Sequence, residues 1–174
     1  MANLFWSNIK ADPKRQYRFT LNIGNIPVWT VKTATKPKAS INVIEQNFIN
    51  HTFKYPGRLT WDPITVTLVD PMDPDLAKTF MEALRNSGYQ YPTSGNVRGS
   101  ISKQKSVLNG LGAITLRMID ADGNPIEEWF LKNPWIADVD FGGTLGYDQD
   151  GMSELSLTIQ YDWAEIVVSG PVAN

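Results

Sequence analysis

The sequence predicts a mainly β protein with an inserted helix and a long extended arm. Apolar and polar residues alternate over several short segments, on both sides of one amphipathic helical segment. The 174 residues are 42% hydrophobic and 11% aromatic, which is enough for the core of one domain. One segment, about residues 35–60, places apolar residues on both faces, so we expect an arm without a core of its own. We therefore treat residues 1–174 as a single domain.

The N-terminal part is expected to form a β-hairpin. Residues 16–23 alternate in the manner of a half-buried strand, with Leu21 and Ile23 on the apolar face. Gly24 and Asn25 are turn residues, and residues 28–31 resume an extended pattern. The two segments are predicted to pair across this turn.

The arm follows the hairpin and is aromatic and basic. Lys36, Pro37 and Lys38 interrupt the strand pattern before it, and Pro56-Gly57 is a turn signal near its end. Excursions of this length in compact domains are usually functional or are ordered by a partner.

A strand and a helix follow the arm. Residues 63–69 form the clearest alternation in the chain, and a helix is predicted over about residues 74–87. Asp73 is placed to cap its N-terminus, Pro74 fits the first helical position, and Gly88 fits the position just after its end. A short helical pattern also covers residues 102–108.

The C-terminal third is again β. The turn Asp122-Gly123-Asn124-Pro125 predicts a hairpin, and the last residues, about 167–174, are expected to form a flexible tail. Strands are expected at residues 113–119, 126–132, 135–141 and 153–163.

Charge is strongly divided along the chain. Residues 1–58 carry nine Lys and Arg against two acidic residues, whereas residues 110–174 carry two against eleven. The net charge of −2 therefore hides a basic N-terminal part and an acidic C-terminal part. Opposed charges of this kind steer association, which favours docking of the basic part of one copy on the acidic part of another. The competing interpretation is that both sets are simply solvated.

The residues that support catalysis are missing from the sequence. There is no cysteine, which excludes disulfides, thiolate metal sites and cysteine nucleophiles, and there is a single histidine. His51 lies in the arm, without a Gly-x-Ser-x-Gly motif in the chain. Glu127 and Glu128 are adjacent in a predicted strand, so they point to opposite faces and cannot work as a carboxylate pair. We expect no enzyme activity and no cofactor.

Two binding interpretations find little support in the sequence. Asp148 and Asp150 are spaced like ligands at the start of a calcium-binding loop, but the glycine, glutamate and flanking helices of an EF-hand are missing. The basic N-terminal part could suggest nucleic acid, but the acidic C-terminal part repels phosphate. No metal is expected. No apolar run is long enough to cross a bilayer and no secretory signal is visible, so synthesis in a cytoplasm is expected.

The order of these motifs resembles the tail tube proteins of contractile-tailed bacteriophages. The likeness rests mainly on Trp61-Asp-Pro-Ile-Thr-Val-Thr, on the helix pattern Leu76, Phe80 and Leu84, and on Thr158-Ile-Gln-Tyr-Asp-Trp, and it covers most of residues 15–165. This resemblance implies a two-sheet β-barrel or sandwich with a flanking helix. It also implies a structural subunit whose six copies close into a ring, with stacked rings forming a hollow tube inside a contractile sheath.

The resemblance further implies partners and sites. The partners would be further copies of the chain, a sheath protein, a tape measure protein in the lumen and a baseplate initiator, with DNA passing through unbound. The particle would be a virion tail assembled in a bacterial cytoplasm. The expected contacts between subunits or rings are Lys36, Lys38, Ile44, Phe48, Phe53, Tyr55 and Arg58. An acidic lumen or partner-facing surface is expected at Asp138, Asp140, Asp148, Asp150 and Glu154.

Three alternatives stay open at this stage. The chain could initiate or terminate a tube, or it could form the tube of a related injection or secretion machine. From another class, it could be a monomeric carbohydrate-binding module that uses Trp29, Trp61 and Trp135 as stacking platforms. Reversal of Lys36 and Lys38 to glutamate is expected to impair assembly without unfolding the domain.

Overall fold

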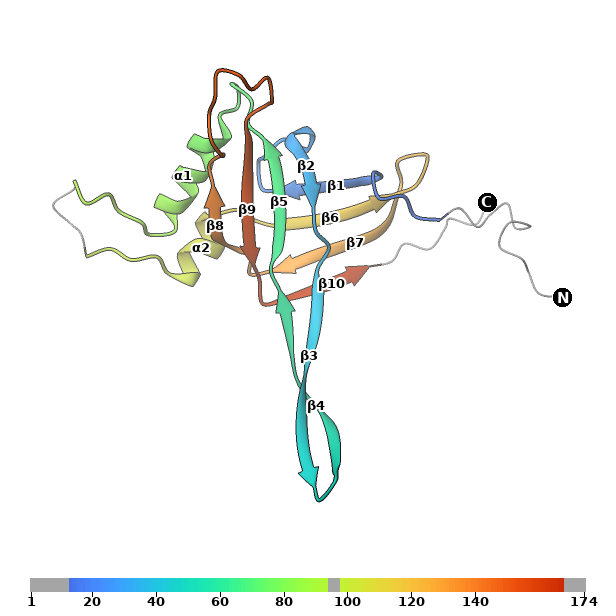
Figure 1. Ribbon diagram of the computed structural model, residues 1–174. Helices are drawn as coiled ribbons and strands as arrows, with labels where there is room; N and C mark the ends of the chain where they lie inside the picture. The colour runs from blue at the N-terminus through green and yellow to red at the C-terminus, as the bar shows by residue number, and fades with distance from the viewer. Residues whose placement is uncertain (1–12, 94–97, 168–174) are drawn as a thin grey trace.

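The computed structural model describes residues 13–93 and 98–167, which fold into two four-stranded antiparallel sheets and a two-stranded arm (Figure 1). The β1 sheet has the order β1 (Phe19–Ile23), β6 (Ile114–Ile119), β7 (Pro125–Lys132) and β10 (Trp163–Val167). The β2 sheet has the order β2 (Val31–Ala34), β5 (Ile64–Val69), β9 (Glu154–Gln160) and β8 (Trp135–Asp140). The arm pairs β3 (Lys38–Phe48) with β4 (His51–Asp62). The predicted mainly β class with two sheets and an extended arm is confirmed.

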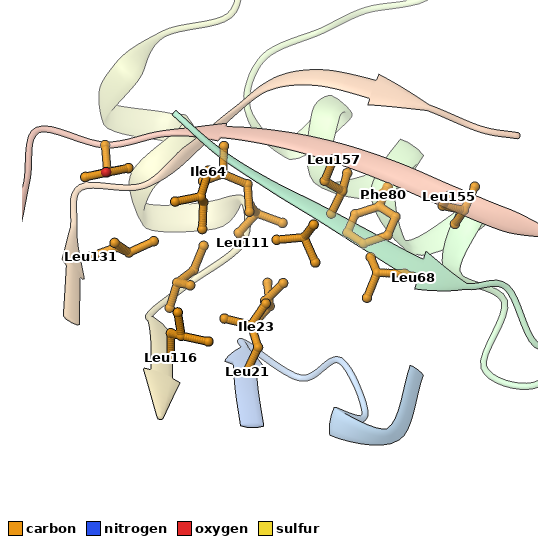
Figure 2. Packing of buried hydrophobic residues seen from close by; sticks show 14 of the residues in the cluster. Leu21, Ile23, Ile64, Leu68, Phe80, Leu111, Leu116, Leu131, Leu155 and Leu157 are labelled. Carbon is orange, nitrogen blue, oxygen red and sulfur yellow. The ribbon is translucent and has the colours of Figure 1, made fainter. Parts of the chain in front are cut away.

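The core lies between the two sheets, whose strands cross steeply (Figure 1). Alternation puts every second residue of β5 and β9 into it, so that Ile64, Val66 and Leu68 are buried while Thr65 is exposed. The β1 sheet supplies the opposite side (Figure 2). Its buried contributors include Leu21, Ile23, Ile114, Leu116 and Leu131.

The helix α1 (Leu76–Asn86) closes one end of the core with Phe80. It begins two residues later than predicted, because Asp75 rather than Asp73 is its N-cap. The Asp75 carboxylate accepts the backbone N–H of Lys78 at 2.9 Å, which leaves Pro74 outside the helix. The helix ends at Asn86 with Ser87 as its C-cap, and Gly88 follows in the predicted position after the end, with a φ of +116° that is unfavourable for other residues.

A second helix, α2 (Lys103–Asn109), matches the short helical pattern in the sequence. Ser102 caps it by accepting the backbone N–H of Lys105 at 3.3 Å. Both helices lie together beside β8 (Figure 1). The fold therefore has two flanking helices, whereas the predicted fold class had one.

The predicted N-terminal hairpin is wrong. β1 pairs with β6 in one sheet and β2 pairs with β5 in the other, and residues 28–30 form the 3-10 helix η2 (Val28–Thr30) between them. Alternation fixes which side chains face the core but not which strand is the neighbour. In η2 the hydroxyl of the buried Thr30 donates to the carbonyl of Pro27 at 2.7 Å, which stabilises the change of direction.

The turn of the arm also differs from the prediction. It lies at Ile49 and Asn50, and Pro56-Gly57 is part of β4. The register shifts between Ile41 and Val43, opposite this dipeptide. A Cβ at position 57 would lie 2.9 Å from the carbonyl oxygen of Asn42, so glycine permits the close approach of the two strands.

The predicted last strand, residues 153–163, divides into two. β9 belongs to the β2 sheet, and the chain then crosses at Tyr161 and Asp162 to enter the β1 sheet as β10. Tyr161 is buried at this crossing, and its hydroxyl donates to the carbonyl of Asp62 at 2.8 Å. The strand β10 was missed by the sequence reasoning, and the tail predicted at 167–174 lies outside the described residues except for Val167.

The packing of α1 leads to a stability prediction. Phe80→Ala removes a ring with no solvent exposure, so we expect the free energy of unfolding to fall by about 3–5 kcal/mol. Chemical denaturation followed by circular dichroism measures the change. Glu82→Ala, on the exposed side of the same helix, is the control and should change it by less than about 0.5 kcal/mol. Equal effects of the two variants would show that Phe80 does not close the core.

Candidate assembly surfaces

The arm projects beyond both sheets and has no core (Figure 1). Ile44 pairs in register with Tyr55, and Gln46 pairs with Phe53, so these side chains share one face. The predicted contact residues Ile44, Phe48, Phe53 and Tyr55 are between 46% and 64% exposed. A two-stranded hairpin is marginally stable by itself, so burial of these apolar side chains against a partner would stabilise the arm.

The opposite face of the arm is apolar as well. Val43 lies across from Pro56, and Ile41 lies across from Leu59. Ile41, Val43 and Leu59 are each more than half exposed. The apolar residues that the sequence places on both sides of this segment are therefore exposed on both faces of the arm. Either face can contact a partner.

Basic side chains at the base of the arm are held by the protein's own acidic residues. The ammonium of Lys36 lies 2.7 Å from a carboxylate oxygen of Glu127, and Lys14 contacts the other oxygen. The indole N–H of Trp129 also donates to Glu127, at 2.6 Å. Lys38 pairs with Asp62 at 2.9 Å where the arm begins, and this contact raises the pKa of Lys38 and lowers that of Asp62.

Glu127 is the buried member of this cluster. Burial alone would raise the pKa of its carboxyl, but the hydrogen bonds from Lys14, Lys36 and Trp129 outweigh burial and lower the pKa to about 2. Removing one member of a buried charge cluster leaves the others unpaired, which is strongly destabilising. Sequence reasoning did not find this cluster, and its one signal was that Glu127 and Glu128 must face opposite sides of their strand.

These pairs change the interpretation of the predicted basic contacts. Lys36 and Lys38 lie in pairs within the chain, and Lys54 lies 3.6 Å from Glu45 across the arm. Arg58 is exposed on β4. A glutamate at position 36 would face the buried Glu127, so we no longer expect the double lysine reversal to leave the domain intact.

The predicted acidic residues occupy three places. Asp138 and Asp140 lie on the outer face of β8, in register with Thr158 and Ser156 of β9. Asp148 and Asp150 lie in the loop between β8 and β9 and are exposed. Glu154 contacts Lys32 across the β2 sheet. No ion pair involves the four aspartates within residues 13–93 and 98–167.

The outer face of the β2 sheet, which we call the hydroxyl face, was missed by the sequence reasoning. Rows of short polar side chains cross it, with Thr33 beside Thr67 and Thr65 beside Thr158. The sequence signal for this face is the set of polar residues that alternate with apolar ones in the strand segments. The hydroxyl face consists of Thr33, Thr65, Thr67, Ser156, Thr158 and Gln160, with Asp138 and Asp140 at its β8 side.

Both sheets have open edges in the part of the chain that the structure describes. The edge strands are β1 and β10 in one sheet and β2 and β8 in the other. Unpaired backbone groups on such edges are ready to pair with a strand of another chain.

The structure gathers no metal or triad constellation in the described ranges. No three His, Asp or Glu side chains there are grouped to hold a metal ion. His51 lies at the tip of the arm, with its ring 4.7 Å from that of Phe53. Within residues 13–93 and 98–167, the two α-helices are too short to span a bilayer.

The three tryptophans of the carbohydrate alternative do not form a platform. Trp29 is exposed, whereas Trp61 and Trp135 are partly buried. Trp61 packs on the core, with its ring 6.0 Å from that of Tyr161. Trp61 therefore serves packing, as aromatic residues in a core commonly do.

Comparison with solved structures shows proteins of the same fold. A chain of the cryo-EM structure of the anti-feeding prophage tube-terminating cap superposes with a TM-score of 0.65 and 15% identity, over 92% of this chain and 99% of that one. A chain of the anti-feeding prophage baseplate gives 0.64 and 12%, over 90% and 97%. A chain of the PVC sheath–tube complex, an extracellular contractile injection system, gives 0.63 and 16%, over 90% and 93%.

These likenesses show that the chain has a fold found in components of contractile injection systems. No protein-family model and no curated protein matches the sequence. The narrower resemblance to phage tail tubes stays a prediction.

The Glu127 cluster predicts a pH dependence of stability. The pKa of Glu127 falls from its ordinary value of 4.5 to about 2 in the folded chain, so its contribution is present above pH 4.5 and is lost as the pH falls toward 2. The full contribution is about 3 kcal/mol. Denaturant unfolding across this range should show a steeper loss of stability for the native chain than for Glu127→Gln.

Glu128→Gln provides the control for this experiment, because Glu128 lies on the opposite face of β7 and pairs with Arg117 at 2.6 Å. The free energy of unfolding of this variant should fall with decreasing pH as that of the native chain does. If the Glu127→Gln variant shows the same fall as the native chain, the cluster does not stabilise the fold.

Proposed function

We propose that this protein is the structural tube subunit of a contractile particle. The observation that carries the proposal is the arm, which exposes apolar side chains on both faces and has no core to cover them. A monomer gains nothing from such an element, whereas a subunit packed among copies of itself buries both faces. The shared fold with components of sheath–tube, cap and baseplate structures supports this role.

The open sheet edges support a closed ring. A heterologous contact between one edge and another either closes a ring or continues as a filament, and closure leaves no edge exposed. We propose six copies per ring, as in the tail tubes that the sequence resembles, with rings stacked into a hollow tube. Permanent interfaces of this kind bury on the order of 2,000 Å² or more, and the arm supplies much of that surface.

The hydroxyl face is proposed as the lining of the tube. Short hydroxyl side chains and the carboxylates of Asp138 and Asp140 dominate this face, and Lys32 beside it is paired with Glu154, so the face offers little to hold a phosphate backbone. DNA could then slide through such a lumen without being held. The proposed partners are a sheath protein outside, a tape measure protein inside and a baseplate initiator at one end.

The proposed setting is a virion tail, assembled in the cytoplasm of a bacterial host. The cap of a tube is a second candidate role, because the cap structure superposes over 99% of its own length. The tube of an injection or secretion machine is a third, supported by the sheath–tube complex of an extracellular injection system.

The test of this function is electron microscopy of the purified protein at high concentration and several ionic strengths. Hollow rings or tubes with sixfold end views are expected for the native chain. Small isolated particles at every concentration, even after addition of a purified baseplate initiator, would contradict the proposal.

The arm variant Ile44→Ser/Tyr55→Ser should abolish these assemblies, because it removes two paired apolar side chains from the proposed interface. Both residues are about half exposed in the single chain, so the unfolding midpoint should change little. Leu108→Ser, at a 70% exposed residue of α2, is the control and should assemble normally. Sedimentation velocity measures the assembled fraction, and normal assembly of the arm variant would remove the arm from the interface.

A further inference from the structure

The arm joins the body of the protein, meaning the two sheets and the helices, through a short joint that lies outside the strands (Figure 1). On one side the joint is residues 35–37, between β2 and β3, and on the other side it is Pro63, between β4 and β5. The pairing of β2 with β5 ends at Thr35, and the pairing within the arm begins at Lys38 and Asp62. The direction of the arm is therefore decided at this joint.

A proline on each side of the joint interrupts the sheet. Pro37 and Pro63 have no backbone N–H, so neither can donate to a ladder of hydrogen bonds. The chain can bend here at less cost than inside β3 or β4, where bending breaks ladder hydrogen bonds. Hinges in proteins consist of a few residues at the ends of regular elements, which is what the joint supplies.

Two contacts with the body hold the joint, one on each strand. The ammonium of Lys36 lies 2.7 Å from Oε1 of Glu127, a buried residue of β7. On the other strand, the buried Tyr161 donates its hydroxyl to the carbonyl of Asp62 at 2.8 Å. Each contact lies next to one of the two prolines and reaches a part of the body that comes much later in the sequence. These contacts therefore limit bending at the joint.

The carboxylate of Glu127 has a second ammonium partner. Lys14 contacts Oε2 while Lys36 contacts Oε1, and the indole of Trp129 also donates to Oε1. Loss of the carboxylate would leave two ammonium groups unpaired, but release of Lys36 leaves the carboxylate with Lys14 and Trp129. The arm can therefore detach from Glu127 without leaving a buried charge alone. This property distinguishes a releasable contact from one on which folding depends.

The other ion pairs of the arm join its two strands to each other. Lys38 pairs with Asp62 at 2.9 Å in the first rung, and Lys54 lies 3.6 Å from Glu45 further out. The arm can therefore turn as one piece. The side chain of Lys36 is 45% exposed, so its ammonium group returns to water more readily than a fully buried one would.

We propose that the arm is a hinged lever, which turns at Pro37 and Pro63 and is held in its direction by a latch. The latch is the contact of Lys36 with Glu127, and the hydroxyl of Tyr161 is a second fastening on the opposite strand. A partner that binds the arm better in another direction shifts the equilibrium by its difference in affinity for the two directions. The device does not depend on the proposed function, because it would serve any partner of the arm.

The lack of cysteine in the chain permits a direct test with a pair of spin labels. Gln46→Cys and Glu82→Cys place one label on the arm and one on the exposed side of α1. Double electron–electron resonance, at a concentration where sedimentation shows single chains, measures the distribution of distances between them. Lys36→Met should raise the population outside the native peak about tenfold, because a charge-assisted hydrogen bond is lost. A native distribution as broad as that of this variant would overturn the proposal.

Lys54→Met is the matched control, because Lys54 pairs with Glu45 within the arm. It should leave the distribution unchanged. A label pair within the body, Glu82→Cys and Asp140→Cys, should be insensitive to Lys36→Met if the domain stays folded. An effect of Lys36→Met that is no larger than that of Lys54→Met, or that broadens the body pair equally, would show that there is no latch.

Tyr161→Phe tests the second fastening, since it removes the hydroxyl and keeps the buried ring. Alone it should broaden the distribution less than Lys36→Met, because a neutral hydrogen bond is weaker than a charged one. Combined with Lys36→Met it should broaden the distribution beyond the sum of the two single effects, because either fastening limits the arm. A double variant that matches Lys36→Met would remove Tyr161 from the device.

Discussion

The arm depends on the pairing of β2 with β5, because both of its strands continue from this pair. The ladder ends where Thr35 donates its N–H to the carbonyl of Thr65 at 3.0 Å and accepts the N–H of Thr65 on its hydroxyl at 2.8 Å. It resumes in the arm at Lys38 and Asp62. A hairpin that would be marginal alone is thus the extension of two strands already fixed by a core. The Glu127 cluster and the Tyr161 hydroxyl hold the same junction from the β1 sheet and from the crossing to β10.

This junction explains why the arm can expose so much apolar surface and still have a defined direction. The residues that orient it are buried or paired at its base, and the residues that remain free lie further out along the arm. In the proposed assembly, stability and contact are therefore carried by different residues. Substitutions along the arm should act on association, whereas substitutions at its base should act on both association and the fold.

The sequence allowed most strands to be recognised, and the turn at Asp122–Pro125 predicted the pairing of β6 with β7, but the other neighbours were not found. Alternation located the clearest strand, and the residues it assigned to the core, Ile64, Val66 and Leu68, are all buried. It could not show that β1 and β2 belong to different sheets, because pairing depends on segments about a hundred residues away, such as β6. The turn of the arm was also out of reach, since nothing in the sequence marks the positive φ of Ile49.

The division of charge acquires a different meaning in three dimensions. Much of the basic N-terminal part is neutralised by the acidic C-terminal part of the same chain, as in the contacts of Lys14 and Lys36 with Glu127 and of Lys32 with Glu154. These pairs join the arm base and β2 to strands that come much later in the sequence, so the polarity helps the chain to close on itself. What remains is a set of aspartates on β8 and in the loop beyond it, with no basic residue after position 132 to balance them. The surplus charge is therefore negative and lies on the hydroxyl face and in the β8–β9 loop. A negative field on the hydroxyl face repels a polyanion, which is the property that the proposed lumen requires.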